Sequence, residues 1–270
     1  MQPSFCAFWN VENLLDIQDS PRRSEKLQRA LNYELQNWTA DLLQQKIRQL
    51  AAVIMQMNEG RGPDLLGLCE VENQAVLQQL VQAVDLPSRQ YKIAHADTAD
   101  HRGIDVAFLY DSTQFEAGEQ FSHCIVKRSA TRDLFQVNFQ TRAEGKLLVV
   151  IGNHWPSRLG GQYESEPYRI IAGETLAYFH QRIQEIHGKN VGVLAMGDFN
   201  DDPYNRSLVD YALSEKNRAK VTHARSPRFL NLMWPLLGEQ GYSLLSESGG
   251  NVRSILDFQG DVNGQGGISD

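Results

Sequence analysis

Four apolar segments of the chain are each followed directly by polar residues of the kinds that bind cations or move protons. These residues are Asn10 in WNVENL, Glu70 in GLCEVEN, Asn153 and His154 in GNHWPSR, and Asp198 and Asn200 in GDFND. At any single position of this kind, the ordinary interpretation is a loop cap or a solvated turn. Burying such groups without partners costs several kcal/mol. Because four segments end in this way, we predict that the four ends converge on one polar pocket.

The atoms that this set offers are mostly oxygens, which favours a hard cation such as Mg²⁺. A cation held by one carboxylate and several waters would leave room for a phosphate oxygen. Asp198 and Asn200 are two residues apart, so in an extended chain they point the same way. The carboxylate could then take a proton from water while the amide orients it, and Gly197 allows a close backbone approach. Two alternatives remain: residues 197–200 (GDFN) form an Asx turn as the chain leaves the strand, and His154 has a structural role.

Hydrophobic periodicity indicates which elements position these residues. Helices are expected at residues 42–57 (N-cap Thr39, stop at Gly60), 74–84, and 167–187 (N-cap Ser165, stop at Gly188). Strands are expected at residues 4–9, 64–69, 91–96, 104–110, 134–140, 146–151 and 191–196. The strands at 134–140 and 146–151 form a hairpin, and residues 135, 137 and 139 face one side of it.

Strands outnumber helices, and some strands are linked by turns rather than by helices. This pattern favours an α+β fold with two packed, mostly antiparallel sheets and helices outside. No proline- or serine-rich linker divides the sequence, so residues 1–270 are expected to form a single domain.

Composition narrows the choice of partners. The 33 acidic and 26 basic residues give a formal charge of −7, which argues against non-specific binding to nucleic acid. Basic residues could still line one rim of the molecule, although scattered charges are usually solvated surface; these residues are Arg22, Arg23, Lys127, Arg128, Arg132 and Arg142.

The compartment and the redox state of the cysteines can also be predicted from the sequence. No apolar run approaches the roughly 18 residues needed to span a bilayer, and Met1–Asn10 does not read as a signal peptide. The three cysteines, Cys6, Cys69 and Cys124, are far apart and lie in apolar stretches. We therefore expect a cytoplasmic protein, with all three cysteines reduced in the core.

Five motifs in order, WNVENL, GLCEVEN, RGIDVAFLY, NHWPSR and GDFND, resemble those of the endonuclease/exonuclease/phosphatase superfamily, which has the deoxyribonuclease-I-like fold. The resemblance spans about residues 5–203. It implies a four-layer αββα sandwich with the site at one edge of the paired sheets. It also implies hydrolysis of a phosphoester, either DNA or a smaller phosphorylated molecule, with Mg²⁺ or alternatively Mn²⁺. The substrate and the oligomeric state stay open.

The resemblance also assigns roles to the residues of the motifs. Glu70 resembles the metal-binding glutamate of the superfamily, and Asn10 the asparagine beside it. Asp198 resembles the aspartate that activates the attacking water, and Asn200 the asparagine that orients that water. His154 matches a histidine near the phosphate or the leaving group. The implied reaction is in-line attack of water on phosphorus.

Four further residues fall where members of the superfamily contact phosphate: Asn153, Arg102, Asp105 and Arg132. The superfamily usually ends its catalytic set with Ser-Asp-His and one more strand, whereas this sequence stops at Asp270, the aspartate of that set. This ending predicts a truncated C-terminus without the last strand, and weak or absent hydrolysis. The alternative function is a catalytically impaired member that binds a phosphorylated ligand or a protein partner.

Overall fold

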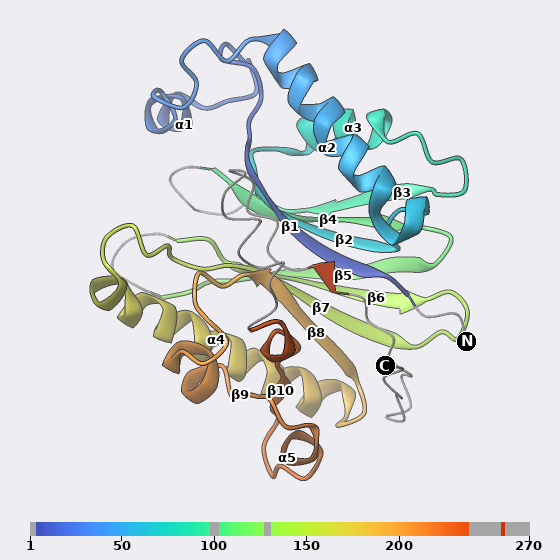
Figure 1. Cartoon of the computed structure of the whole chain (residues 1–270), viewed down its shortest axis with the longest axis vertical. Coiled ribbons are helices and arrows are strands. Elements are labelled where there is room, and N and C mark those ends of the chain that lie inside the picture. Colours follow the sequence, from blue (N-terminus) through green and yellow to red (C-terminus); the bar gives the residue numbers. More distant parts are fainter. Residues whose placement is uncertain (1–3, 98–102, 127–130, 238–254, 257–270) are drawn as a thin grey trace.

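The computed structural model describes residues 4–97, 103–126 and 131–237, together with the backbone of residues 255–256. Two sheets are stacked face to face, and helices cover the outer face of each sheet (Figure 1). The layers therefore run helix, sheet, sheet, helix. This arrangement confirms the predicted α+β sandwich.

The first sheet has the strand order β11-β1-β2-β4-β3. Its strands are β1 (Cys6–Leu14), β2 (Leu65–Val71), β3 (Tyr91–His95), β4 (Asp105–Asp111) and the short β11 (Ile255–Leu256). The pair β1–β2 is parallel, and the other pairs are antiparallel. β2 lies between two strands with both faces covered, which explains why its sequence is almost continuously apolar.

The second sheet has the strand order β5-β6-β7-β8. Its strands are β5 (Phe115–His123), β6 (Leu134–Thr141), β7 (Leu147–His154) and β8 (Gly192–Asp198). β6 and β7 form the predicted hairpin, and β8 runs parallel to β7. Phe135, Val137 and Phe139 of β6 all enter the core between the sheets, as their alternation predicts. β5 has no counterpart in the predicted strands, because its exposed face carries a polar run without clear alternation.

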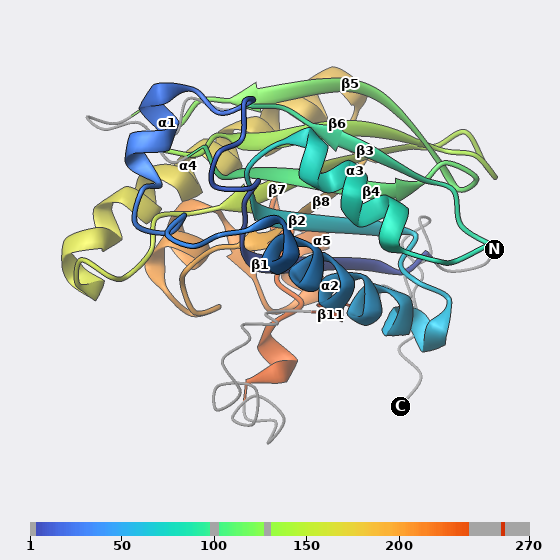
Figure 2. The same cartoon turned by 90° about the horizontal axis from the view of Figure 1, so that it is seen from above.

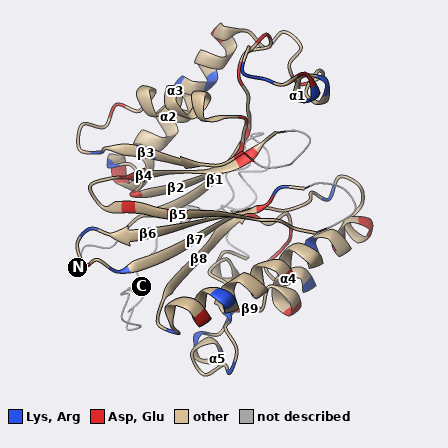
Figure 3. Ribbon diagram, turned by 180° about the vertical axis from the view of Figure 1, so that it is seen from behind, with Lys and Arg blue, Asp and Glu red and all other residues tan. Residues whose placement is uncertain are grey.

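Two helices, α2 (Ala40–Gly60) and α3 (Gln74–Ala83), lie side by side over the first sheet (Figure 2). The Thr39 hydroxyl accepts from the Leu42 N–H and caps α2 as predicted. The end of α2 is irregular, because Asn58 and Glu59 adopt left-handed backbone angles. Charged residues occur mainly in the helices and loops, whereas most of the length of the strands has other residue types (Figure 3).

The helix α4 (Gln162–His187) covers the second sheet and begins earlier than the sequence indicates. The prediction placed Ser165 as its cap and Pro167 at its start, following the preference of proline for a first helical turn. Instead Gly161 precedes the helix, Ser165 lies in the first turn, and its hydroxyl donates to the Gly161 carbonyl. The predicted stop at Gly188 is confirmed.

Short elements complete the described chain. They are α1 (Glu25–Ala30), α5 (Arg218–Thr222), β9 (Ser214–Glu215), β10 (Phe229–Leu230), a π-helical turn at Ser207–Tyr211 and a 3₁₀ turn at Trp234–Leu236. Cys6 and Cys69 are free thiols in the core, as expected, but Cys124 is exposed, so that part of the prediction is wrong. Within the described residues, no helix has the length and apolar character needed to cross a membrane.

Candidate active site

Residues near the C-terminal ends of four strands meet at one edge of the sandwich. In the first sheet, Asn10 of β1 pairs in register with Cys69, the neighbour of Glu70 on β2. In the second sheet, His154 at the end of β7 pairs with Asp198 at the end of β8. A hydrogen bond between Asn10 and Asp198 joins the two sheets at this edge. Segments that are far apart in the sequence therefore supply one cluster.

One amide connects the two acidic residues of this cluster. The Asn10 Nδ2 group donates to Glu70 Oε1 and to Asp198 Oδ2, each at 3.1 Å. The His154 Nε2 atom lies 3.5 Å from Glu70 Oε1. The Glu70 side chain is 19% exposed and the His154 side chain 2%, so solvent reaches the cluster from the Glu70 side. The structure thus brings together Asn10, Glu70, His154 and Asp198.

The backbone around the cluster takes left-handed conformations that non-glycine residues seldom adopt. The φ angle is 53° at Glu12, 62° at Asn13, 64° at Glu70 and 51° at Asn200. The Glu12 N–H donates to Asn10 Oδ1 at 2.9 Å, and the Asn13 N–H donates to Glu70 Oε2 at 3.1 Å. β1 therefore continues past Asn10 through an irregularity in its pairing, whereas the sequence indicated that the strand ends at residue 9. At Glu12 and Glu70 this conformation costs on the order of 1–2 kcal/mol per residue, and such strain is typical of functional sites.

The loop after β8 is held from two sides. The Asn200 N–H donates to Asp198 Oδ1 at 3.0 Å, and Asn200 Nδ2 donates to the Trp155 carbonyl at 3.0 Å. Arg158 donates from Nε to the Asn200 carbonyl at 2.8 Å and pairs with Asp201 at 3.0 Å. Sequence reasoning did not single out Arg158, although its place at the end of the NHWPSR motif is a signal that could have identified it.

Gly197 allows β7 and β8 to approach closely beside the cluster. It pairs with Asn153 across the ladder, and a β-carbon at Gly197 would lie 2.3 Å from the Asn153 carbonyl oxygen. A methyl group cannot come so close to a backbone oxygen, so only glycine fits here. The close approach expected from the sequence is present, and it sets the position of the adjacent Asp198.

Asn153, which the sequence assigns to phosphate binding, lies inside the protein next to His154. The residue is fully buried, and its Nδ2 group donates to the carbonyls of Ile151 and Met196. Its Oδ1 atom accepts from Trp155 Nε1 at 3.0 Å. Both ends of the amide are therefore used inside the protein, and Asn153 holds β7 and β8 together next to His154. A phosphate contact by Asn153 stays a prediction, and the contacts of this side chain give it a structural role as well.

Asp105 and Arg132 lie at the same edge of the sandwich but are buried, with 1% and 5% of their surface exposed. Asp105 begins β4 and pairs with Val71 of β2, and Arg132 precedes β6. A phosphate contact by either residue stays a prediction. Arg102 and Asp270, which the sequence also singled out, lie outside the described residues.

Lys46 of α2 is a basic residue near the cluster that the sequence did not reveal. Its ammonium group donates to the Glu12 carbonyl. Burial lowers the pKa of Lys46, and the negative charges of Glu12 and Glu70 partly offset that effect. No motif contains Lys46, because it reaches the cluster from α2 and not from the end of a strand. It supplies a positive charge on the Glu70 side of the cluster.

The chemistry of the cluster fits a hard divalent cation. Burial raises the pKa of the Cys69 thiol well above its usual value, and the negative charges of Asp198 and Glu70 add to that effect. Two carboxylates that share the neutral amide of Asn10 repel each other, and a cation would offset that repulsion. Carboxylate and amide oxygens are suitable ligands for Mg²⁺ or Mn²⁺.

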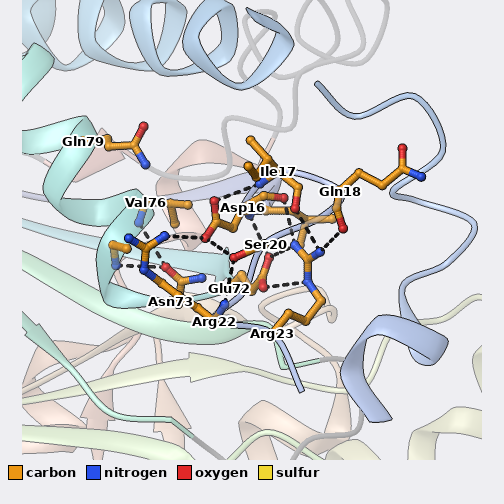
Figure 4. Close-up of polar contacts among 12 residues, drawn as sticks. Asp16, Ile17, Gln18, Ser20, Arg22, Arg23, Glu72, Asn73, Val76 and Gln79 are labelled. Carbon is orange, nitrogen blue, oxygen red and sulfur yellow. Dashed lines mark hydrogen bonds and ion pairs between the residues drawn. The ribbon is translucent and has the colours of Figure 1, made fainter. Parts of the chain in front are cut away.

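A second polar network, drawn in Figure 4, lies beside the cluster and is centred on Arg23. The Arg23 guanidinium donates to both carboxylate oxygens of Glu72, at 2.8 and 2.7 Å. It also donates to the carbonyls of Asp16, Ile17 and Gln18. The Arg23 side chain is 0% exposed, so it does not line a basic rim. Arg23 instead fixes the loop between β1 and α1.

The sequence and the fold together define the family. Residues 5–249 match the Endonuclease/Exonuclease/phosphatase family, and because this match covers most of the sequence, the chain belongs to that family. This confirms the resemblance seen in the motifs. No curated protein matches the sequence.

Solved structures with a similar fold are related only distantly in sequence. An endonuclease/exonuclease/phosphatase family protein from Bacteroides thetaiotaomicron has a TM-score of 0.50 and 16% identity, over 79% of this chain and 70% of that chain. The human nocturnin catalytic domain with a bound sulfate anion has a TM-score of 0.49 and 17% identity, over 78% and 69%. TDP2 from Caenorhabditis elegans has a TM-score of 0.49 and 15% identity, over 74% of this chain and 48% of that chain. This chain thus spans about half the length of that TDP2, and the likeness concerns the fold alone.

Proposed function

We propose that the protein is a divalent-cation-dependent phosphoester hydrolase whose reaction takes place at the cluster of Asn10, Glu70, His154 and Asp198. The observation that carries this proposal is the Asn10 amide, which joins a carboxylate of one sheet to a carboxylate of the other. The family to which the chain belongs is named for nucleases and phosphatases, and both classes hydrolyse phosphoesters. The left-handed backbone at Glu70 and Asn200 supports a functional role for this edge.

Each residue of the cluster would have its own role in the reaction. Glu70 and Asn10 would hold Mg²⁺ or Mn²⁺, which when bound would offset negative charge on the phosphoryl oxygens. Asp198 would take a proton from the attacking water as the water oxygen bonds to phosphorus and the bond to the leaving group breaks. Asn200, held by Trp155 and Arg158, would orient that water.

Two side chains near Glu70, His154 and Lys46, would assist the reaction. His154 faces Glu70 and could contact a phosphoryl oxygen or the leaving group. Lys46, on the same side as Glu70, could attract the negatively charged substrate. The formal charge of −7 favours a substrate recognised by specific contacts over one held by a broadly positive surface. The fold does not choose between DNA and smaller phosphoesters.

A panel of phosphoesters tests the proposal. We would assay double-stranded, single-stranded and abasic DNA, RNA, inositol phosphates, sugar phosphates and a chromogenic phosphodiester with Mg²⁺, with Mn²⁺ and with a chelator. At least one substrate should be hydrolysed in a manner that the chelator abolishes. Asp198→Asn should lower that rate by about 100- to 10,000-fold, the range typical of a lost general base.

Asp85→Asn is the matched control, because Asp85 is an exposed carboxylate just beyond the end of α3. Its rate should equal that of the wild type. Hydrolysis that survives in Asp198→Asn would place the chemistry elsewhere. Binding of a phosphorylated ligand without turnover would favour the alternative of an impaired, ligand-binding member of the family.

A further inference from the structure

His95, Asp97 and Asp105 form a second group of metal-binding side chains at the ends of β3 and β4. One ligand atom from each residue lies within 4.8 Å of those from the other two. This group shares no residue with the cluster of Asn10, Glu70, His154 and Asp198 described above. It lies at the same edge of the first sheet, because Asp105 pairs with Val71, the residue after Glu70.

The strands themselves bring the two buried ligands together. β3 and β4 are antiparallel neighbours, and His95 pairs with Ala107, two residues beyond Asp105. His95 and Asp105 therefore emerge on the same face of adjacent strands. Asp97 follows the end of β3 by two residues and is exposed. Two ligands thus come from rigid strands, and the third comes from the start of the connecting loop.

His95 supplies an independent sign that something binds between these residues. Its side chain is only 4% exposed, and among the described residues no hydrogen-bond partner contacts its Nε2 atom. The Asp105 Oδ2 atom lies 3.8 Å from His95 Nε2, which is too far for a hydrogen bond. A buried ring nitrogen without a partner is unfavourable. The Nε2 atom faces the Asp105 carboxylate, and a ring nitrogen of His95 lies within 4.8 Å of carboxylate oxygens of both Asp97 and Asp105, where a cation would give it a ligand bond.

The separation of these atoms suits a metal ion. Ligand bonds from imidazole and carboxylate to Zn²⁺ are about 2.0–2.2 Å long, so two ligands of one ion lie between 3 and 4 Å apart, on the order of the His95–Asp105 distance. A nitrogen ligand shifts the preference from Mg²⁺ toward transition metals. We propose that His95, Asp97 and Asp105 bind a transition-metal dication, Zn²⁺ or Mn²⁺, at a site separate from that of Glu70.

The exposure of Asp97 defines the character of this site. A structural zinc site is usually closed by four protein ligands, whereas three protein ligands leave a position for water or another molecule. Here the two strand ligands are buried and the loop ligand faces solvent. The ion would therefore exchange with solution, and its open position would lie on the solvent side. This inference does not depend on the proposed hydrolysis.

Calorimetric titration of the full chain with ZnCl₂ and with MnCl₂ tests the inference. The variants are His95→Gln and Asp105→Asn in the second group, Glu70→Gln in the first, and His187→Gln as a control, since His187 is an exposed histidine at the end of α4. Zn²⁺ should bind the wild type, Glu70→Gln and His187→Gln with equal affinity. It should bind His95→Gln at least about 10-fold more weakly, the minimum expected when even a supporting ligand contact is lost.

Each outcome decides the matter. Equal Zn²⁺ affinity in His95→Gln and the wild type would overturn the inference, as would no Zn²⁺ binding to the wild type. Loss of Zn²⁺ binding in Glu70→Gln would mean one shared site rather than two. Circular dichroism and thermal melts in chelator show whether Asp105→Asn, which alters a buried residue, still folds; His95→Gln carries the test if it does not. Failure of the proposed hydrolysis leaves these expected titrations unchanged.

Discussion

Two buried clusters of charge lie side by side in this protein, and they are built differently. Around Arg23, a guanidinium meets the carboxylate of Glu72 in two parallel hydrogen bonds, and backbone carbonyls take its other protons. Around Asn10, two carboxylates, Glu70 and Asp198, share one neutral amide. Each cluster takes one acidic residue from the same stretch of chain. Glu70, in β2, belongs to the Asn10 cluster, and Glu72, the residue just after β2, belongs to the Arg23 network.

The difference between these clusters separates a structural role from a functional one. In the Arg23 network positive and negative charge balance, the geometry is bidentate, and both side chains are almost completely buried. In the Asn10 cluster negative charge is in excess, the backbone is strained, and Glu70 keeps an opening to solvent. A balanced network stabilises the fold, whereas an unbalanced one can bind a cation at some cost in stability.

The largest effect is expected from Glu70→Gln. Hydrolysis should fall by at least about 100-fold, the loss seen when one group that stabilises transition-state charge is removed. Without metal, the free energy of unfolding should stay within about 1 kcal/mol of the wild type or increase, because one of two like charges is gone. Kinetics together with urea denaturation in chelator measure both quantities. A large loss of stability would erase the contrast between the two clusters.

The opposite pattern is expected from Arg23→Met. Removing one partner of a buried ion pair leaves Glu72 unpaired, and the free energy of unfolding should fall by about 3–5 kcal/mol. Urea denaturation of Arg23→Met and of the double variant Arg23→Met/Glu72→Met gives the comparison, and the double variant should recover most of the loss. If Arg23→Met kept full stability, the network would not be the support of the β1–α1 loop that its contacts indicate.

A smaller effect is expected at His180, which is buried without forming either kind of charged cluster. Burial lowers its pKa to about 4, and its ring stacks on Phe229 with centroids 4.0 Å apart. The unfolded chain binds a proton here below about pH 6.5 while the folded chain stays neutral, so stability is full above that pH and falls as the pH drops toward 4. Melting temperatures between pH 7 and pH 4 should fall less steeply in His180→Phe than in the wild type. Equal slopes would mean that other groups cause the acid sensitivity.

The sequence predicts most of this fold because its strands are short, apolar and bounded by polar motifs. The same feature predicts that Asn10, Glu70, His154 and Asp198 meet. Each follows a buried strand, and a polar group at that position needs polar partners. β5 escapes prediction because its polar exposed face hides the alternation. The start of α4 is misplaced because Pro167 resembles a first-turn residue while lying inside the helix.

Other parts of the site depend on tertiary contacts that no local pattern contains. Arg22 and Arg23 are adjacent in a polar loop, yet their side chains are 62% and 0% exposed. Only the position of Glu72 in the folded chain decides which of them is buried. Lys46 reaches the cluster from a helix without a motif, and the left-handed angle of Glu70 coincides with irregular pairing of β2 to both of its neighbours, β1 and β4.

The close approach of β7 and β8 at Gly197 also affects how this protein tolerates mutation. Adding one carbon there would push Asn153 and the rest of β7, which carries His154, away from β8, which carries Asp198. A genetic screen for loss of function would therefore flag a residue that never meets the substrate, alongside those that do. The cluster therefore depends on the spacing of the β7 and β8 backbones as well as on its acidic side chains.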